Sequence, residues 1–311
     1  MNLVKEIAVD PESLVSRADF RYLFEKLGFW NGLLCMRIPK APGSSWEQEI
    51  LRACRDPIDR QWIEAQLASR ALGRLSTLPE LGSSKVSSWE DTVRAANIRR
   101  KLELAITNNF ASTKGLAPPF LPLNDVDESL LSTVREVTVR ADAKSMMAVC
   151  LPLVRQSSHL YLVDPYFKPL APSRLRLLKE ISAVCRSERC EYLTVITSNR
   201  YLSPVESEGC NVDLLRSEIQ SIVSKGRRLT IEIVGVTKKQ DDEEGFHARY
   251  LLSAAGGIRF DHGFELDNKR HDVALIDKSR HEQLVERYFA GLRKNFEIGF
   301  DECFYGLPKR Q

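Results

Sequence analysis

A stretch of twenty residues, "FHARYLLSAAGGIRFDHGFE" (246–265), holds side chains suited to phosphate chemistry. His247 and Arg249 lie two residues apart, so in a strand both side chains project from the same face. An imidazole can attack phosphorus, and a guanidinium can bind two phosphoryl oxygens. In the structural alternative, His247 is a surface residue at a strand start and Arg249 pairs with the acidic run 241–244. Taken alone, the two residues favour this structural interpretation.

Glycines follow this pair and could bring backbone N–H groups to a phosphate. Gly256 and Gly257 allow a tight turn or a close backbone approach. Gly263, followed by Phe264 and Glu265, predicts a second turn nearby. Backbone N–H groups at such turns can reach phosphate oxygens. A plain β-hairpin with glycine at its turn accounts for the same pattern.

A third candidate is Asp164, which ends the strand-like run "YLVDPYF" (161–167). A carboxylate at the end of a buried strand, followed by Pro165, points from the sheet edge into a loop. Binding sites of open α/β sheets gather at such strand ends. The alternative is that Asp164 caps the turn or the next helix. If the site is real, Asp164 and His247 lie on neighbouring strands with their side chains at the same edge of the sheet.

The elements that must position these residues begin near residue 158, where strands alternate with helices. This alternation favours an α/β sandwich with helices packed on a central mixed sheet. Strands are predicted over 158–167, 191–199, 228–236, 246–254 and 272–277. Helices are predicted over 173–187, 212–226, where Gly226 is the C-cap, and 279–296.

Residues 1–145 are predicted to form a helix-rich N-terminal region of unknown role, followed by a domain over 146–311. Helical spacing of apolar residues predicts helices within 16–30, 44–57, 59–75 and 87–106, and a further helix leads from 126 towards 156. The run 32–39 suits a short strand. Three tryptophans on the helices are predicted core anchors: Trp46, Trp62 and Trp89. The proline-rich segment 112–125 reads as a linker or an extended crossing segment.

The combination of a DPY strand, an H-x-R strand and a Gly-rich hairpin resembles the phospholipase D (PLD) superfamily, especially bacterial PLD-like domains associated with antiphage defence. It is also similar in outline to the PLD-like C-terminal domain of eukaryotic MIT-domain proteins. The resemblance covers about residues 150–300. It implies a PLD-like fold and metal-independent phosphodiesterase or nuclease chemistry without a cofactor. In that chemistry His247 is the nucleophile, Arg249 the phosphate clamp and Asp164 the acid of the DPY strand.

The chain departs from the superfamily pattern of H-x-K, four residues, an aspartate and a Gly-Ser-x-Asn turn. Arg249 stands in place of the lysine and Ala254 in place of the aspartate. Gly263 and Phe264 replace Gly-Ser, and Asn268 is only loosely placed. Loss of the aspartate removes the group expected to orient the imidazole, which can matter by orders of magnitude.

The number of histidines is a second departure, because active superfamily sites use two. One H-x-R is present here, so a second histidine would have to come from a homodimer partner or from His262. The other two nearby histidines, His271 and His281, are predicted to be surface residues.

Composition adds bounds on location and partners. No apolar run approaches the roughly 20 residues that span a bilayer, and the N-terminus does not resemble a signal peptide. We therefore expect a cytoplasmic protein without integral membrane association. Seven cysteines without a CxxC pair indicate reduced thiols, not a disulfide framework or zinc knuckle. A net charge of +3 does not mark a nucleic-acid binder, although it allows a local basic patch.

Two functions of different classes follow. The first is a PLD-like phosphodiester-binding or nuclease subunit that acts on nucleic acid, DNA or RNA, in a bacterial defence or mobile-element complex, with a degenerate site. The second is a catalytically inactive adaptor subunit that binds other proteins. Lipid headgroup binding is a weaker alternative, by analogy to the eukaryotic domain. We expect the isolated chain to show little or no cleavage, because Ala254 replaces the orienting acid.

Overall fold

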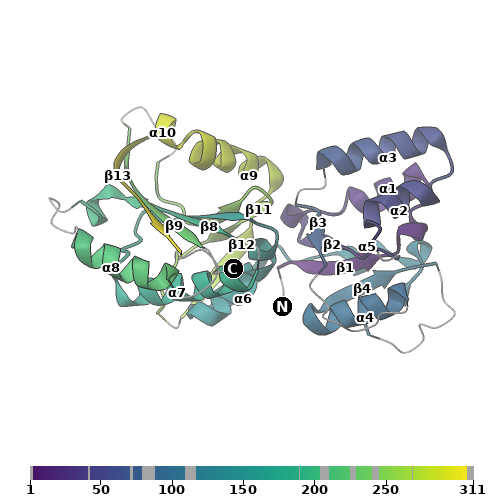
Figure 1. The fold of residues 1–311 in the computed structure, drawn as a ribbon, viewed down its shortest axis with the longest axis horizontal. Helices are drawn as coiled ribbons and strands as arrows, with labels where there is room; N and C mark the ends of the chain where they lie inside the picture. The colour runs from purple at the N-terminus through teal and green to yellow at the C-terminus, as the bar shows by residue number, and fades with distance from the viewer. Residues whose placement is uncertain are drawn as a thin grey trace. The chain divides into compact units, whose positions relative to one another are not determined.

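The computed structural model divides the chain into two compact units, Asn2–Arg135 and Glu136–Gln311, the latter together with Met1 (Figure 1). Residues 136–145 thus belong to the second unit, whereas the sequence predicted a boundary at 145. The structure describes residues 3–40, 43–70, 73–78, 88–108, 117–188, 190–203, 210–224, 229–239, 245–267 and 269–306.

The first unit contains a five-stranded sheet in the order β3-β2-β1-β4-β5, in which every pair of neighbours is parallel. Its strands are β1 (Lys5–Val9), β2 (Leu33–Arg37), β3 (Leu75–Thr77), β4 (Leu102–Ile106) and β5 (Phe120–Leu121). The sequence predicted β2 alone. Strands of parallel sheets are buried on both faces and read as short apolar runs without alternation. The helix predicted within 87–106 therefore includes "LELAI", which is strand β4 in the structure.

Helices pack on this sheet, and three of them begin with a serine N-cap. The helices are α1 (Arg17–Phe24), α2 (Trp46–Ala53), α3 (Pro57–Arg70), α4 (Trp89–Arg99) and α5 (Glu128–Leu131). Ser16, Ser45 and Ser88 each accept a hydrogen bond from a backbone N–H of the first turn of α1, α2 and α4. The helices predicted within 16–30, 44–57, 59–75 and 87–106 are therefore present.

Two hydrophobic clusters in this unit show that both faces of the sheet are covered. Ile7 of β1 belongs to one cluster and Ala8 to the other, as the alternation of a strand requires. Trp46 and Trp89 anchor the two sides, since each is almost fully buried and donates its indole N–H to a backbone carbonyl. Trp62 is partly buried against the first cluster.

The described part of the proline-rich segment is packed and does not link the two units. Phe120 and Leu121 form β5 and pair with β4. Phe120 and Leu123 are buried. The extended interpretation of this segment is therefore correct for residues 117–125, and residues 112–116 lie outside the described part.

The second unit is built on an eight-stranded mixed sheet in the order β13-β9-β8-β7-β10-β11-β12-β6. The neighbours β7, β8 and β9 are parallel, and the other pairs are antiparallel. Its strands are β6 (Glu136–Arg140), β7 (His159–Val163), β8 (Tyr192–Ser198), β9 (Thr230–Lys238), β10 (Tyr250–Ser253), β11 (Gly256–Phe260), β12 (Arg270–Leu275) and β13 (Phe296–Tyr305). This confirms the predicted α/β class with a central mixed sheet.

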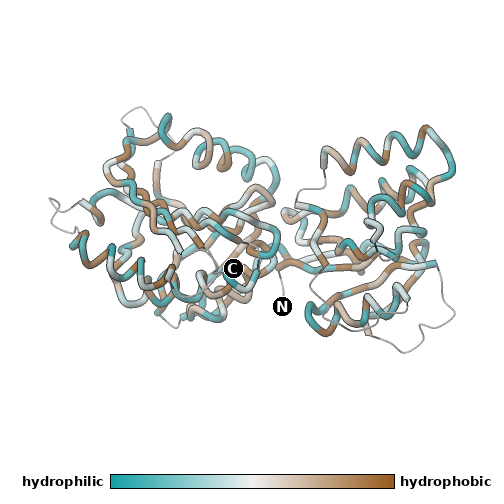
Figure 2. Tube along the Cα trace, in the orientation of Figure 1, coloured by the Kyte–Doolittle hydropathy of each residue, from teal (hydrophilic) through white to brown (hydrophobic). Residues whose placement is uncertain are grey.

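Helices cover both faces of this sheet. Figure 1 shows α6 (Ala143–Arg155), α7 (Pro172–Ser187) and α8 (Val212–Val223) on one side and α9 (Lys278–Val285) and α10 (Leu292–Asn295) on the other. A π-helical turn, Glu286–Ala290, separates α9 from α10. Hydrophobic residues run along the strands between these layers (Figure 2). Among the helices that the structure describes, none has the length and apolar character that a bilayer crossing requires.

Two local predictions differ from the structure, and one cannot be compared with it. The predicted helix over 126–156 holds for α5 and α6, but β6 lies between them. The strand predicted over 246–254 begins only at Tyr250, and Gly226, the predicted C-cap of α8, lies outside the described residues. Strand β13 was not predicted, because its sequence "FEIGFDECFY" follows a helix without a turn signal.

Candidate phosphate-binding site

The sheet register brings the predicted site residues to one edge. Tyr250 of β10 pairs with Val163 of β7. Asp164 directly follows β7 and Arg249 directly precedes β10, so the two residues are neighbours. The carboxyl ends of the parallel strands β7 and β8 lie at the same edge, which is where ligands of α/β sheets bind.

Asp164 is the buried member of this group, with 1% of its surface exposed. Its Oδ1 accepts the backbone N–H of Tyr166 at 2.9 Å, and its Oδ2 lies 3.5 Å from the N–H of Phe264. Burial raises the pKa of Asp164, while the Tyr166 N–H and the charges of Arg174 and Arg249 act in the opposite direction. Asp164 therefore holds two backbone segments together and does not face a ligand directly.

Arg249 is fixed on three sides. Its Nη1 donates to the carbonyl of Asp261 at 2.9 Å, and its Nε lies 4.0 Å from Asp164 Oδ1. The guanidinium carbon lies 4.9 Å from the ring centre of Tyr166. The side chain remains 28% exposed, so a preoriented cation faces solvent. The acidic run 241–244, its proposed structural partner, lies outside the described residues.

The two predicted glycines have different surroundings. Gly263 adopts a φ of 74°, and a Cβ there would lie 2.9 Å from Arg249 Cδ and 3.2 Å from Asp164 Oδ2. Glycine at 263 therefore permits both the turn and the Arg249 position. Gly257 pairs with Leu252 near the hairpin turn, and a Cβ there would lie 2.8 Å from Ile276 Cδ1. Gly257 thus serves packing, away from Arg249.

His247 is exposed, and its Nδ1 lies 3.2 Å from the hydroxyl oxygen of Tyr166. Tyr166, the tyrosine of the DPY motif, was not among the residues predicted for the site. Arg200, which follows β8, lies with its guanidinium carbon 5.8 Å from the same ring. Tyr166 therefore contacts His247 and both arginines. Together we name these residues the strand-end cluster: Asp164, Tyr166, Arg200, His247, Arg249 and Gly263.

A further arginine lies behind Asp164. Arg174 of α7 is 7% exposed, and its Nη1 is buried without a hydrogen-bond partner. Burial lowers the pKa of Arg174, while the charges of Asp164 and Glu265 raise it. The carboxylate of Asp164 thus interacts with two guanidinium groups. Helical periodicity gave no sign of a buried arginine here.

The remaining sequence candidates lie apart from the cluster. Ala254 lies in the turn between β10 and β11, so a carboxylate there would be at the far end of β10 from His247. His271 and His281 are 3% and 5% exposed, so the prediction that they are surface residues is wrong. His271 lies on the inner face of β12, and His281 Nε2 lies 2.8 Å from the carbonyl of Ser253. His262 is exposed, and Asn268 lies outside the described residues.

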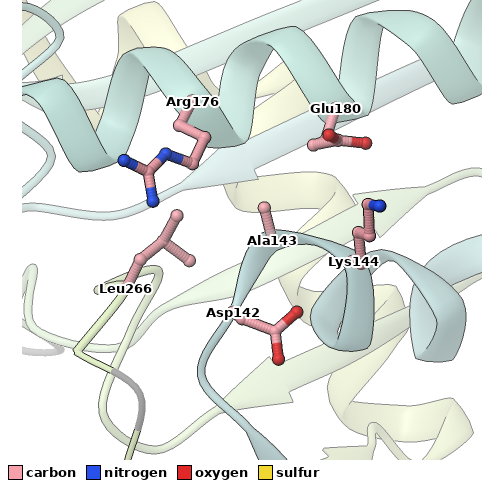
Figure 3. A pocket seen from close by; sticks show the side chains of 6 residues that line it. All are labelled: Asp142, Ala143, Lys144, Arg176, Glu180 and Leu266. Carbon is pink, nitrogen blue, oxygen red and sulfur yellow. The ribbon is translucent and has the colours of Figure 1, made fainter.

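A pocket of about 180 Å³ lies beside the connection between β11 and β12, which also carries Gly263 (Figure 3). It is lined by Asp142, Ala143, Lys144, Arg176, Glu180 and Leu266. Two cationic and two anionic side chains face it, so its charge does not select an anion.

Within the described residues, two groups of side chains could approach a metal ion: Glu232, Asp301 and Cys303, and Glu136, Asp261 and Asp272. Neither includes a residue of the strand-end cluster.

No protein-family model and no curated protein matches the chain. No family is shown. Solved structures include partial matches, one of which is described as "Structure of TrmBL2, an archaeal chromatin protein, shows a novel mode of DNA binding". That match has 12% identity and a TM-score of 0.30, and it covers 52% of this chain and 54% of the other, about half its length. A likeness at this level carries no argument about function, which must rest on the site.

Proposed function

We propose that the C-terminal unit binds the phosphodiester backbone of a nucleic acid, DNA or RNA, at the strand-end cluster, and that it does so without cleaving it. The observation that carries this proposal is Arg249, which is held on three sides beside the exposed His247. A preoriented guanidinium forms charge-assisted hydrogen bonds to phosphate oxygens and loses little freedom on binding.

The partner of His247 favours binding over nucleophilic attack. Attack by Nε2 requires a lone pair there, and hence a proton on Nδ1, which an orienting carboxylate enforces. Here the neighbour of Nδ1 is the hydroxyl of Tyr166, which can donate a hydrogen bond to it. In the tautomer in which the hydroxyl donates to Nδ1, Nε2 carries the hydrogen and is a donor. His247 and Arg249 would both donate to the oxygens of one phosphate.

A polymeric ligand is favoured by the cations at the same sheet edge. Exposed basic residues follow each of the three parallel strands: Lys168 after β7, Arg200 after β8, and Lys238 at the end of β9. A backbone with regularly spaced phosphates can contact several of them, whereas a single phosphate cannot. The ring of Tyr166, 37% exposed, offers a surface on which a base can stack.

The resemblance to the PLD superfamily supports a phosphodiester ligand. It is also the only support for the proposed setting, which is a subunit of a bacterial defence or mobile-element complex. The second proposal is an inactive adaptor subunit that binds other proteins. It is favoured because, within the part of the chain that the structure describes, the hydrogen-bond partner of His247 is a hydroxyl and not a carboxylate. Lipid headgroups offer the same phosphate group. Binding to anionic vesicles but not to oligonucleotides would support the lipid alternative.

The proposal predicts that labelled single- and double-stranded oligonucleotides remain intact with the protein, with or without EDTA. We expect His247→Ala to weaken binding two- to fivefold, about 0.5–1 kcal/mol, as for the loss of one hydrogen bond. Gel electrophoresis and fluorescence anisotropy measure the two effects, and His159→Gln is the control histidine variant. Cleavage in EDTA that His247→Ala abolishes would show instead that His247 is a nucleophile.

A further inference from the structure

A pair of histidines in the connection between β11 and β12 lies outside the strand-end cluster. The ring centres of His262 and His271 are 5.0 Å apart, with an angle of 44° between the ring planes. His262 is exposed, whereas His271 is 3% exposed. One imidazole thus faces solvent and the other lies beneath it.

Asp267 determines which nitrogen of His271 carries a proton. Its Oδ1 lies 3.2 Å from Nε2 of His271, and a carboxylate only accepts hydrogen bonds. Nε2 therefore carries the hydrogen, and the neutral imidazole presents a lone pair at Nδ1. That Nδ1 is buried and has no hydrogen-bond partner among the described residues. A buried polar atom of this kind costs about 1–3 kcal/mol when unsatisfied, and a bound ion is one explanation for it.

We infer that His262 and His271 ligate one divalent cation of the zinc type, His271 through Nδ1. Two imidazoles that bind zinc at about 2.1 Å with a tetrahedral angle have ring centres about 5 Å apart. The observed ring-centre separation of 5.0 Å allows this arrangement. A carboxylate on the far nitrogen of a ligating histidine is the arrangement that orients such ligands and raises their basicity.

His262, the exposed member of the pair, is the ligand from whose side the ion would enter. The same connection carries Gly263 and Phe264, which contact Asp164 and Arg249. A bound ion would therefore fix the loop that closes one side of the strand-end cluster. The inference itself stands on the two histidines and does not depend on nucleic-acid binding.

Zinc titration of the full chain by calorimetry tests this site. The Cys303→Ala background is used, because Cys303, Glu232 and Asp301 offer competing donor atoms. We expect one bound zinc, at least tenfold weaker affinity in His262→Ala, about tenfold weaker affinity in Asp267→Asn, and unchanged affinity in His247→Ala. Zinc should also raise the melting temperature of the parent but not of His262→Ala.

A cobalt spectrum adds a readout of ligand type, since imidazole and water ligands give no thiolate charge-transfer band. The melting temperature without metal shows that His262→Ala is folded, as expected for an exposed side chain. Absence of zinc binding, or equal affinity in the parent and His262→Ala, would overturn the inference. A thiolate band in the Cys303→Ala background would do so as well.

Discussion

Asp164→Ala is expected to lower the free energy of unfolding by about 3–5 kcal/mol, as for other buried charges that lose their partner. The change removes the acceptor of the Tyr166 N–H and the carboxylate nearest the Phe264 N–H. It also leaves Arg174, already buried with one unpaired nitrogen, without its neighbouring negative charge. Urea denaturation followed by circular dichroism measures the effect.

Asp164→Asn is the matched control, because it keeps an acceptor oxygen and the side-chain size while removing the charge. Burial raises the pKa of Asp164, so the folded protein holds this proton at a higher pH than the unfolded chain. Ionisation of Asp164 therefore reduces stability as the pH rises from its ordinary value of 3.8 through the raised pKa. The asparagine variant should lack this loss. A stable Asp164→Ala protein would contradict the assigned role.

Arg249→Ala is expected to weaken oligonucleotide binding by roughly 1.5–3 kcal/mol, or about 10- to 150-fold. The guanidinium is held in place by the Asp261 carbonyl, Asp164 and the Tyr166 ring, so its charge-assisted hydrogen bonds are lost with the side chain. The slope of log affinity against log salt should fall by about one, because one phosphate contact is lost. Fluorescence anisotropy at several salt concentrations measures both quantities.

The control for Arg249→Ala is Arg216→Ala, which removes the same charge from α8, where Arg216 pairs with Glu302. It should change the affinity little. Arg249→Lys should fall between the parent and alanine, since lysine keeps the charge but loses the bidentate geometry. Equal losses in Arg249→Ala and Arg216→Ala would mean that binding depends on net charge and not on the cluster.

Five strands of the second unit, β7, β8, β9, β10 and β12, were predictable because β-branched runs there are bounded by turn residues, whereas β6 and β13 were not predicted. The placement of Asp164 and His247 at one edge of the sheet was a hypothesis about the site and did not follow from the alternation of strands and helices. The parallel sheet of the first unit was not predictable in the same way. Its strands are runs of five or fewer residues, buried on both faces, so they lack the period of two that marks a half-exposed strand.

The partners within the site were the least predictable part. Tyr166 reaches His247 only because of the turn that Asp164 stabilises. Arg174 lies on the inner side of α7, and His271 on the inner face of β12, where composition alone places charged and polar residues at the surface. Burial of these groups depends on tertiary pairing that a local pattern does not encode.

The central claim is that the strand-end cluster recognises backbone phosphate. The most direct measurement compares the affinity of the protein for one oligonucleotide with that for the same sequence on an uncharged methylphosphonate backbone. We predict clear binding of the charged strand, sensitive to Arg249→Ala, and loss of binding of the neutral strand. Equal binding of the two strands, or no binding of either, would contradict phosphate recognition at this site.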